Sequence, residues 1–133
     1  MANQFKETLR NWIDLRDIER IIPIGLEALA KGILNTTEDG PELLHKLIFF
    51  EHEHHHNGRG NPSIRIIKDL FEILVKSGTP INGFYLGGTA LTASIAYGAS
   101  IVFNLLMAHP LIDLNILGQH KPEWTALITA ICY

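Results

Sequence analysis

The spacing of apolar residues along the first part of the chain predicts short amphipathic helices. Over residues 3–22, apolar side chains recur every three to five positions and charged side chains fill the positions between them, as on the two faces of a helix. Pro23 marks the end of this helix or the start of the next, because proline lacks the N–H that a helix interior uses. A second helix is predicted to end near Asn35. A third begins at Pro41, after the turn-forming residues 36–40.

The rest of the chain predicts more short helices. Residues 64–76 form a fourth helix that stops at Gly78. Helices five and six are expected within 89–97 and 99–108, and a seventh begins near Thr125. The period-2 alternation that marks a half-buried strand is absent. The pattern therefore predicts an all-α protein.

A long uncharged segment qualifies this picture. Between Lys76 and Asp113 the chain has no Lys, Arg, Asp or Glu, and residues 89–108 are mostly apolar over a length that could span a bilayer. The run holds hydroxyl and amide side chains, with Gly98 near its middle, and no belt of Trp, Lys or Arg brackets it as at membrane interfaces. A membrane-embedded helix pair is the weaker alternative. We expect two short buried helices and no membrane span.

Composition narrows the class of protein further. A chain of 133 residues fits one small domain. The net charge of −3 provides no broad basic face, so nucleic acid is not expected as a main partner. The single cysteine, Cys132, excludes an internal disulfide framework and suits a reducing compartment. We therefore expect a cytoplasmic protein without a cofactor.

Two stretches of sequence recur in phase. TALTASIAY at 89–97 returns as TALITAICY at 125–133, and FEILVKSGTPIN at 71–82 is echoed by FNLLMAHPLIDLN at 103–115. Such repetition is typical of proteins in which helix pairs stack, because one pair cannot cover its own apolar face.

The repeated stretches resemble the ankyrin-repeat family, whose unit reads roughly G-x-T-P-L-H-x-A-A-x-x-G and then V-x-L-L-L-x-x-G-A-D-V-N. The G, T, P, L and G positions of the middle unit correspond to Gly87, Thr89, Ala90, Leu91 and Gly98. In the first unit the G, L and H positions are Gly40, Leu44 and His45, whereas Glu42 and Leu43 depart from the pattern. The closing half-motifs lie at 71–82 and 113–115.

The resemblance implies an ankyrin-like helical solenoid of stacked helix-turn-helix repeats. A helical N-terminal cap would occupy 1–37, and about three degenerate repeats would occupy 38–133, as units 38–82, 83–115 and an incomplete 116–133. In such units the Thr hydroxyl caps the first helix and glycine permits the left-handed turn at a helix end. The His45 imidazole would bond to the backbone of neighbouring loops.

The resemblance also implies a function, since ankyrin-like stacks mostly bind proteins through their concave face and loop tips. Aromatic side chains recur two places past a pair of small residues and would form a column on that face: Phe50, Tyr97 and Tyr133. The loop tips would add Phe84, Tyr85, Leu86, His120, Lys121, Glu123 and Trp124. The alternative for the first unit is that an insertion at 51–62 folds over Phe49 and Phe50 and buries them.

The sequence EHEHHHNGRG at 51–60 offers a different function. His52, Glu53 and His56 spell H-E-x-x-H, in which two histidines hold zinc and the glutamate activates a water. The extended motif with a third histidine fails, because position 62 is proline. A zinc-dependent hydrolase that uses His52, Glu53 and His56 remains the alternative function. Non-catalytic metal binding by His52, His55 and His56 is a second alternative. We expect a helix overhang that runs into a polar loop, in a protein that is not an enzyme.

The C-terminal end of the sequence suggests a fragment. Tyr133 stands just before the glycine position of its unit, so the second helix of that unit would still follow. We expect either a larger protein, in which a further region could carry catalysis, or an open repeat covered by a partner or by self-association. The Ile- and Asn-rich composition and degenerate repeats are compatible with a bacterial effector that acts on host proteins.

Overall fold

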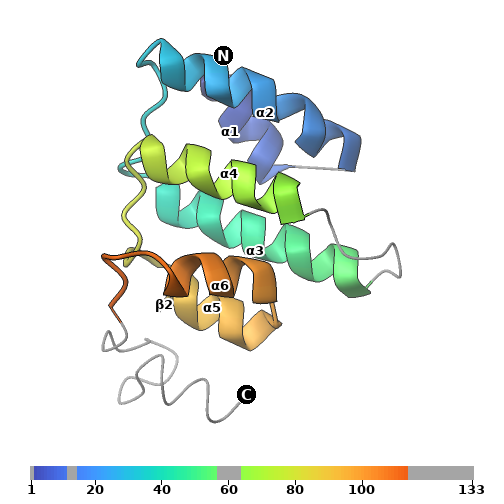
Figure 1. Ribbon diagram of the computed structural model, residues 1–133, viewed down its shortest axis with the longest axis vertical. Coiled ribbons are helices and arrows are strands. Elements are labelled where there is room, and N and C mark those ends of the chain that lie inside the picture. Colours follow the sequence, from blue (N-terminus) through green and yellow to red (C-terminus); the bar gives the residue numbers. More distant parts are fainter. Residues whose placement is uncertain (1, 12–14, 57–63, 114–133) are drawn as a thin grey trace.

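The structure is a computed structural model that describes residues 2–11, 15–56 and 64–113 (Figure 1). Over these residues the regular secondary structure is helical apart from one short hairpin, so the predicted all-α class is confirmed. The elements are α1 (Ala2–Arg10), α2 (Leu15–Ala30), α3 (Gly40–His56), α4 (Ile64–Lys76), β1 (Phe84–Tyr85), β2 (Gly88–Thr89), α5 (Ala90–Tyr97) and α6 (Ser100–Met107).

The described helices form three pairs that stack in layers (Figure 1). α1 packs on α2, α3 on α4, and α5 on α6. Between the layers, α3 contacts both α1 and α5, while α4 contacts both α2 and α6. The middle pair is therefore covered from both sides, which explains why α3 is apolar around most of its circumference.

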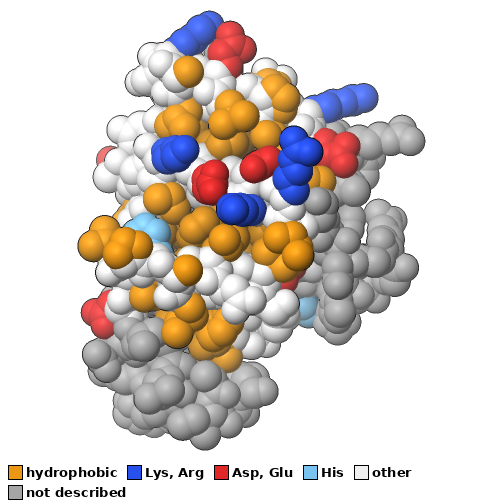
Figure 2. Space-filling view, in the orientation of Figure 1, with side chains coloured by type: hydrophobic (Ala, Val, Ile, Leu, Met, Phe, Trp, Pro, Cys, Tyr) orange, Lys and Arg blue, Asp and Glu red, His pale blue; other side chains and the backbone are white. Residues whose placement is uncertain are grey.

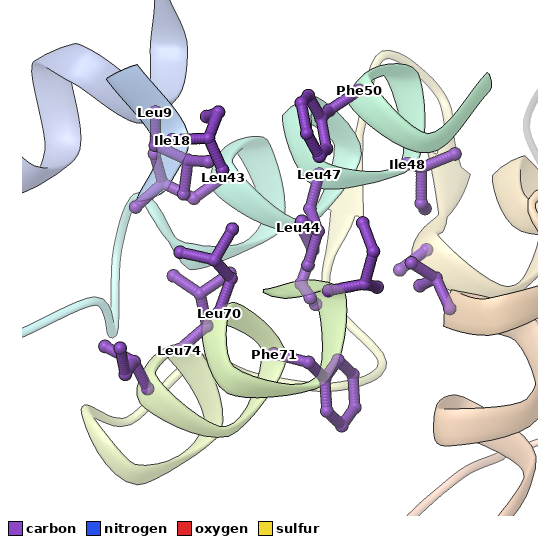
Figure 3. Packing of buried hydrophobic residues seen from close by; sticks show 14 of the residues in the cluster. Leu9, Ile18, Leu43, Leu44, Leu47, Ile48, Phe50, Leu70, Phe71 and Leu74 are labelled. Carbon is purple, nitrogen blue, oxygen red and sulfur yellow. The ribbon is translucent and has the colours of Figure 1, made fainter. Parts of the chain in front are cut away.

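The core is continuous through the three layers (Figure 3). On α3, Leu43, Leu47 and Phe50 recur at helical spacing and are fully buried. From α4, Leu70 and Leu74 are buried in the same cluster. Burying a leucine side chain of this kind contributes about 2 kcal/mol to the free energy of folding.

α2 and α4 end in the same way. Gly32 and Gly78 both have positive φ, of 69° and 103°. In each case the glycine N–H donates to the carbonyl three residues earlier, and the next N–H donates to the carbonyl five residues earlier, all at 3.1 Å. This is the Schellman arrangement, which satisfies the last carbonyls of a helix. The stop predicted at Gly78 is confirmed.

The N-terminal region differs from the sequence prediction. The single helix expected over 3–22 is wrong: α1 ends at Arg10, and the Asn11 side chain donates to the Glu7 carbonyl at 3.1 Å. The break expected at Pro23 is also wrong, because Pro23 lies inside α2. Pro23 is exposed, so water can reach the carbonyl that loses its helical donor.

Ion pairs join the N-terminal helix to the start of α3. The Arg10 guanidinium donates to Glu42 at 2.7 Å and to Asp39 at 3.0 Å, and Lys6 pairs with Asp39 at 2.9 Å. The hydrogen bond to Glu42 raises the pKa of Arg10, although burial opposes this. These contacts fix the first layer against the second.

The long uncharged run is divided between two helices. α5 begins at Ala90, where the Thr89 hydroxyl accepts the N–H of Thr92 at 3.3 Å, and Gly98 ends it with φ 68°. The predicted helices within 89–97 and 99–108, the Thr89 cap and the left-handed glycine are thus confirmed. None of the helices in the described ranges is long and apolar enough to cross a membrane. The helix predicted from Thr125 lies outside the described residues.

A short hairpin precedes α5. β1 pairs antiparallel with β2, with Phe84 opposite Thr89 and Tyr85 opposite Gly88. No strand was predicted from the sequence, because two-residue strands are too short to show period-2 alternation.

Candidate functional site

α3 presents two different faces. Leu43, Leu47 and Phe50 point into the core, and Phe50 is fully buried. The prediction that Phe50 contributes to an exposed aromatic column is therefore wrong. The physical reason is helical phase: Phe50 continues the core stripe, whereas its neighbour Phe49 is only partly buried and lies over His45.

Five rings from three elements form a continuous set of contacts, which we call the aromatic row: Tyr85, His45, Phe49, Tyr97 and His52. The ring centroids are separated by 5.1 Å (Tyr85–His45), 6.4 Å (His45–Phe49), 5.0 Å (Phe49–Tyr97) and 5.3 Å (His52–Tyr97). All four contacts are edge-to-face, a favoured arrangement for aromatic rings.

The residues of the aromatic row differ in their exposure to solvent. His45 is 3% exposed, whereas Tyr97 is 44% exposed. Tyr85, Phe49 and His52 are half-buried. Lys46 places its ammonium 5.9 Å from the centre of the Phe49 ring. The row therefore contains solvent-accessible rings whose orientation is fixed by contacts with the neighbouring rings.

His45 is a structural residue of the row. Its Nδ1–H donates to the carbonyl of Pro41 at 2.8 Å, one turn earlier in α3. The bond to backbone was predicted, but the partner lies in the same helix and not in a neighbouring loop. Burial lowers the pKa of His45 and the hydrogen bond opposes this only in part.

The hairpin tip carries exposed apolar side chains. Phe84 is 45% exposed and Leu86 is 65% exposed. The two-residue turn consists of Leu86 and Gly87, with φ 53° and 85°. Positive φ at both positions is the type I′ turn that suits a tight hairpin, and Asn or Gly is preferred at its first position. Leucine there costs about 1 kcal/mol, because Cβ crowds the backbone.

The hairpin is held against the start of α3. Tyr85 packs its ring on His45. A Cβ at Gly83 would lie 2.5 Å from Pro41 Cγ, so only glycine allows this approach. Because Phe84 pairs with Thr89, which caps α5, the position of the tip is tied to both first helices of the adjacent layers.

Glu51 has a role that the sequence analysis did not identify. Its side chain is buried, and its two carboxylate oxygens accept the N–H groups of Ile101 and Val102 at 2.9 and 3.0 Å. The residue at the N-cap of α6, Ala99, makes no side-chain cap. A carboxylate at a helix N-terminus is favoured by the exposed N–H groups and the helix dipole. No sequence signal identifies this contact, because the cap comes from a helix fifty residues earlier.

The H-E-x-x-H residues lie at the end of α3, so the predicted helix overhang to His56 is confirmed. His52 donates from Nδ1 to the carbonyl of Tyr97 at 3.0 Å. The side chains of His55 and His56 lie outside the described residues. Among the side chains that are described, no group of three or more His, Cys, Asp or Glu could hold a metal ion.

A shallow groove lies on the loop side of the second and third layers. Its volume is about 490 Å³, and it is lined by Val75, Thr79, Pro80, Ile81, Asn82, Gly83, His109 and Leu111. Asn82, one of the lining residues, bonds to the loop after α6: Nδ2 donates to the Leu111 carbonyl at 2.8 Å, and Oδ1 accepts the Asp113 N–H at 2.9 Å. The lining contains no acidic or basic side chain other than His109. The hydrogen bonds of Asn82 therefore join two layers of the stack, and the groove offers no charged group for a reactive site.

The face over α2 and α4 provides a contrast with the aromatic row. Figure 2 shows Lys, Arg, Asp and Glu side chains interspersed there with hydrophobic ones, and no region of a single charge dominates, whereas α6 carries no charged side chain. The mixed surface over α2 and α4 is typical of a solvated face.

The remaining predicted contact residues, His120, Lys121, Glu123, Trp124 and Tyr133, lie outside the described residues. No protein-family model, no curated protein and no solved structure matches the chain.

Proposed function

We propose that this protein is a protein-binding module of the ankyrin-like helical solenoid type. It would bind a partner protein through the aromatic row together with the exposed hairpin tip at Phe84 and Leu86. The observation that carries the proposal is the link between these two features. Tyr85, the strand residue between the exposed Phe84 and Leu86, packs on His45 of the aromatic row, in which Tyr97 is 44% exposed.

Several contacts support the repeat architecture. The helix pairs stack layer on layer, and equivalent glycines end α2 and α4. Thr89 and Gly98 perform the roles that the resemblance assigns to them. Asn82 bonds to the backbone of the next loop along the stack, as a repeat interface requires.

The chemistry of the surface supports a protein as the partner. Aromatic residues whose rings are already ordered lose little conformational entropy on binding, and they are enriched at the centres of protein interfaces. Tyr97 and Tyr85 also carry a hydroxyl that can bond at the edge of such an interface. The segment between Lys76 and Asp113 has no Lys or Arg, so it lacks the cations that phosphates require.

Site-specific photo-crosslinking tests the proposal. Benzoylphenylalanine would be placed at the position of Phe84 or of Tyr97, and the protein irradiated in extract of the cells that produce it. We expect one protein to be captured from both positions. The matched control is the same group at Glu72, which is exposed on α4.

Capture at the Phe84 and Tyr97 positions without capture at the Glu72 position is the expected result. Equal labelling from all three positions, or labelling from the Glu72 position alone, would contradict the proposal.

A further inference from the structure

Leu86 is in a conformation that neither its backbone preference nor its packing explains. Within the described ranges it is the one residue other than glycine with positive φ. A leucine in this region is disfavoured because its Cβ lies close to the following carbonyl oxygen. Asn-Gly or Gly-Gly would form the same turn without this cost.

Burial among the residues that the structure describes does not compensate for the strain. Leu86 is 65% exposed, and the strand residue before the turn, Tyr85, is the one that packs onto α3. A strained residue that is not buried by the described part of its own fold points to a gain made elsewhere. We infer that Leu86 is the anchor by which the hairpin tip enters an apolar pocket on the partner protein.

The partner to which we commit is a folded protein with an uncharged pocket. Phe84 and Leu86 are both exposed at the tip, so a surface that buries them together is concave. The segment around it contains no Lys, Arg, Asp or Glu from 77 to 112, so an uncharged pocket can cover it without burying an unpaired charge. A lipid surface is disfavoured on the same ground, because hairpin tips that enter anionic membranes rely on neighbouring basic residues.

This inference rests on the proposed function, and two variants at one position test it. Leu86→Asn removes both the apolar side chain and the strain, whereas Leu86→Ala removes the side chain and keeps a Cβ at positive φ. We expect Leu86→Asn to raise the thermal midpoint by about 4 °C and Leu86→Ala to leave it unchanged. Leu111→Asn is the matched control, because Leu111 is 72% exposed and has no positive φ.

Binding would be measured with single-domain antibodies selected from a synthetic library against the wild-type protein. We expect most independent clones to lose at least tenfold in affinity for both Leu86 variants and to keep their affinity for Leu111→Asn. A variant that gains stability while it loses binding is the signature of an anchor held under strain.

Four results would overturn the inference. Leu86→Asn could fail to raise the midpoint, or the clones could depend on Leu86 no more often than on Leu111. Sedimentation with phosphatidylcholine vesicles that Leu86→Asn abolishes would make the tip a lipid contact. A dimer lost in Leu86→Asn would make a second copy the occupant.

The two proposals fail separately in this experiment. If the clones lose affinity for Tyr97→Ala and not for the Leu86 variants, the proposed surface stands and the anchor assignment fails. If neither residue matters to any clone, both fail.

Discussion

The ring of Tyr97 meets the ring of Phe49 edge to face, with the centroids 5.0 Å apart and the ring planes at 80°. Phe49 lies on α3 and Tyr97 on α5, so the contact joins two layers of the stack. The same pair is the centre of the aromatic row. One contact thus contributes to both the stacking of the layers and the order of the proposed surface.

The Phe49–Tyr97 contact should be measurable as a coupling between two substitutions. We expect Phe49→Ala and Tyr97→Ala to couple by about 0.5–1.5 kcal/mol in the free energy of unfolding. Either substitution alone already removes the edge-to-face contact, so the double variant does not lose it a second time. Urea unfolding of the two single variants and the double variant measures this value. Tyr97→Ala combined with Ile64→Ala, an exposed residue on α4, is the control that should be additive.

The buried carboxylate of Glu51 should matter more to stability than its place in a histidine-rich stretch suggests. We expect Glu51→Ala to lower the free energy of unfolding by about 2–3 kcal/mol, since two N–H groups of α6 lose a charged acceptor. Glu51→Gln keeps one acceptor oxygen and should cost less. The matched control, Glu72→Ala on the exposed face of α4, should change stability by less than about 0.5 kcal/mol. Equal effects at the two positions would show that Glu51 does not cap α6.

Stability should depend on pH through His45. Burial lowers the pKa of the folded-state imidazole below its ordinary value of 6.5. In the pH range between the lowered pKa and 6.5, the unfolded state binds more protons than the folded state. The stabilising effect of the neutral ring is therefore complete above pH 6.5, and it declines as the pH falls through this range. We expect the loss of stability between pH 7.5 and pH 5.5, measured by urea unfolding, to be smaller in His45→Gln than in the wild type. An unchanged pH dependence would mean that His45 is not the group responsible.

Removal of metal should leave the protein unchanged. For tag-free protein purified without a metal column, we expect less than stoichiometric zinc by elemental analysis and the same thermal midpoint after chelation. About one zinc per chain, lost in His52→Ala together with stability, would instead support the hydrolase alternative. The bond from His52 Nδ1 to the Tyr97 carbonyl does not decide between these results, since metal-bound histidines commonly make such a bond.

The sequence predicted the elements whose signals are local. α4 has the boundaries expected from its amphipathic period, and Gly78, Thr89 and Gly98 have the capping roles that their chemistry favours. α1 and α2 were predicted less well, because tertiary packing decides whether a helix continues through Pro23.

The candidate surface was predicted only in part. Tyr97, Phe84 and Leu86 are exposed as expected, whereas Phe50 is buried and Phe49 takes the surface position. Two adjacent phenylalanines on a helix that is apolar on most sides have the same sequence signal. Which of them faces the core depends on contacts with α4 and α5, which are distant in sequence.

The most direct test of the account is the affinity of the crosslinked partner, titrated against purified wild type, Tyr97→Ala and Glu72→Ala by isothermal calorimetry. We predict that Tyr97→Ala weakens binding by at least tenfold, as expected for a central aromatic contact, and that Glu72→Ala binds like the wild type. An unchanged affinity for Tyr97→Ala, with its fold intact by circular dichroism, would contradict the claim that the aromatic row is the binding surface.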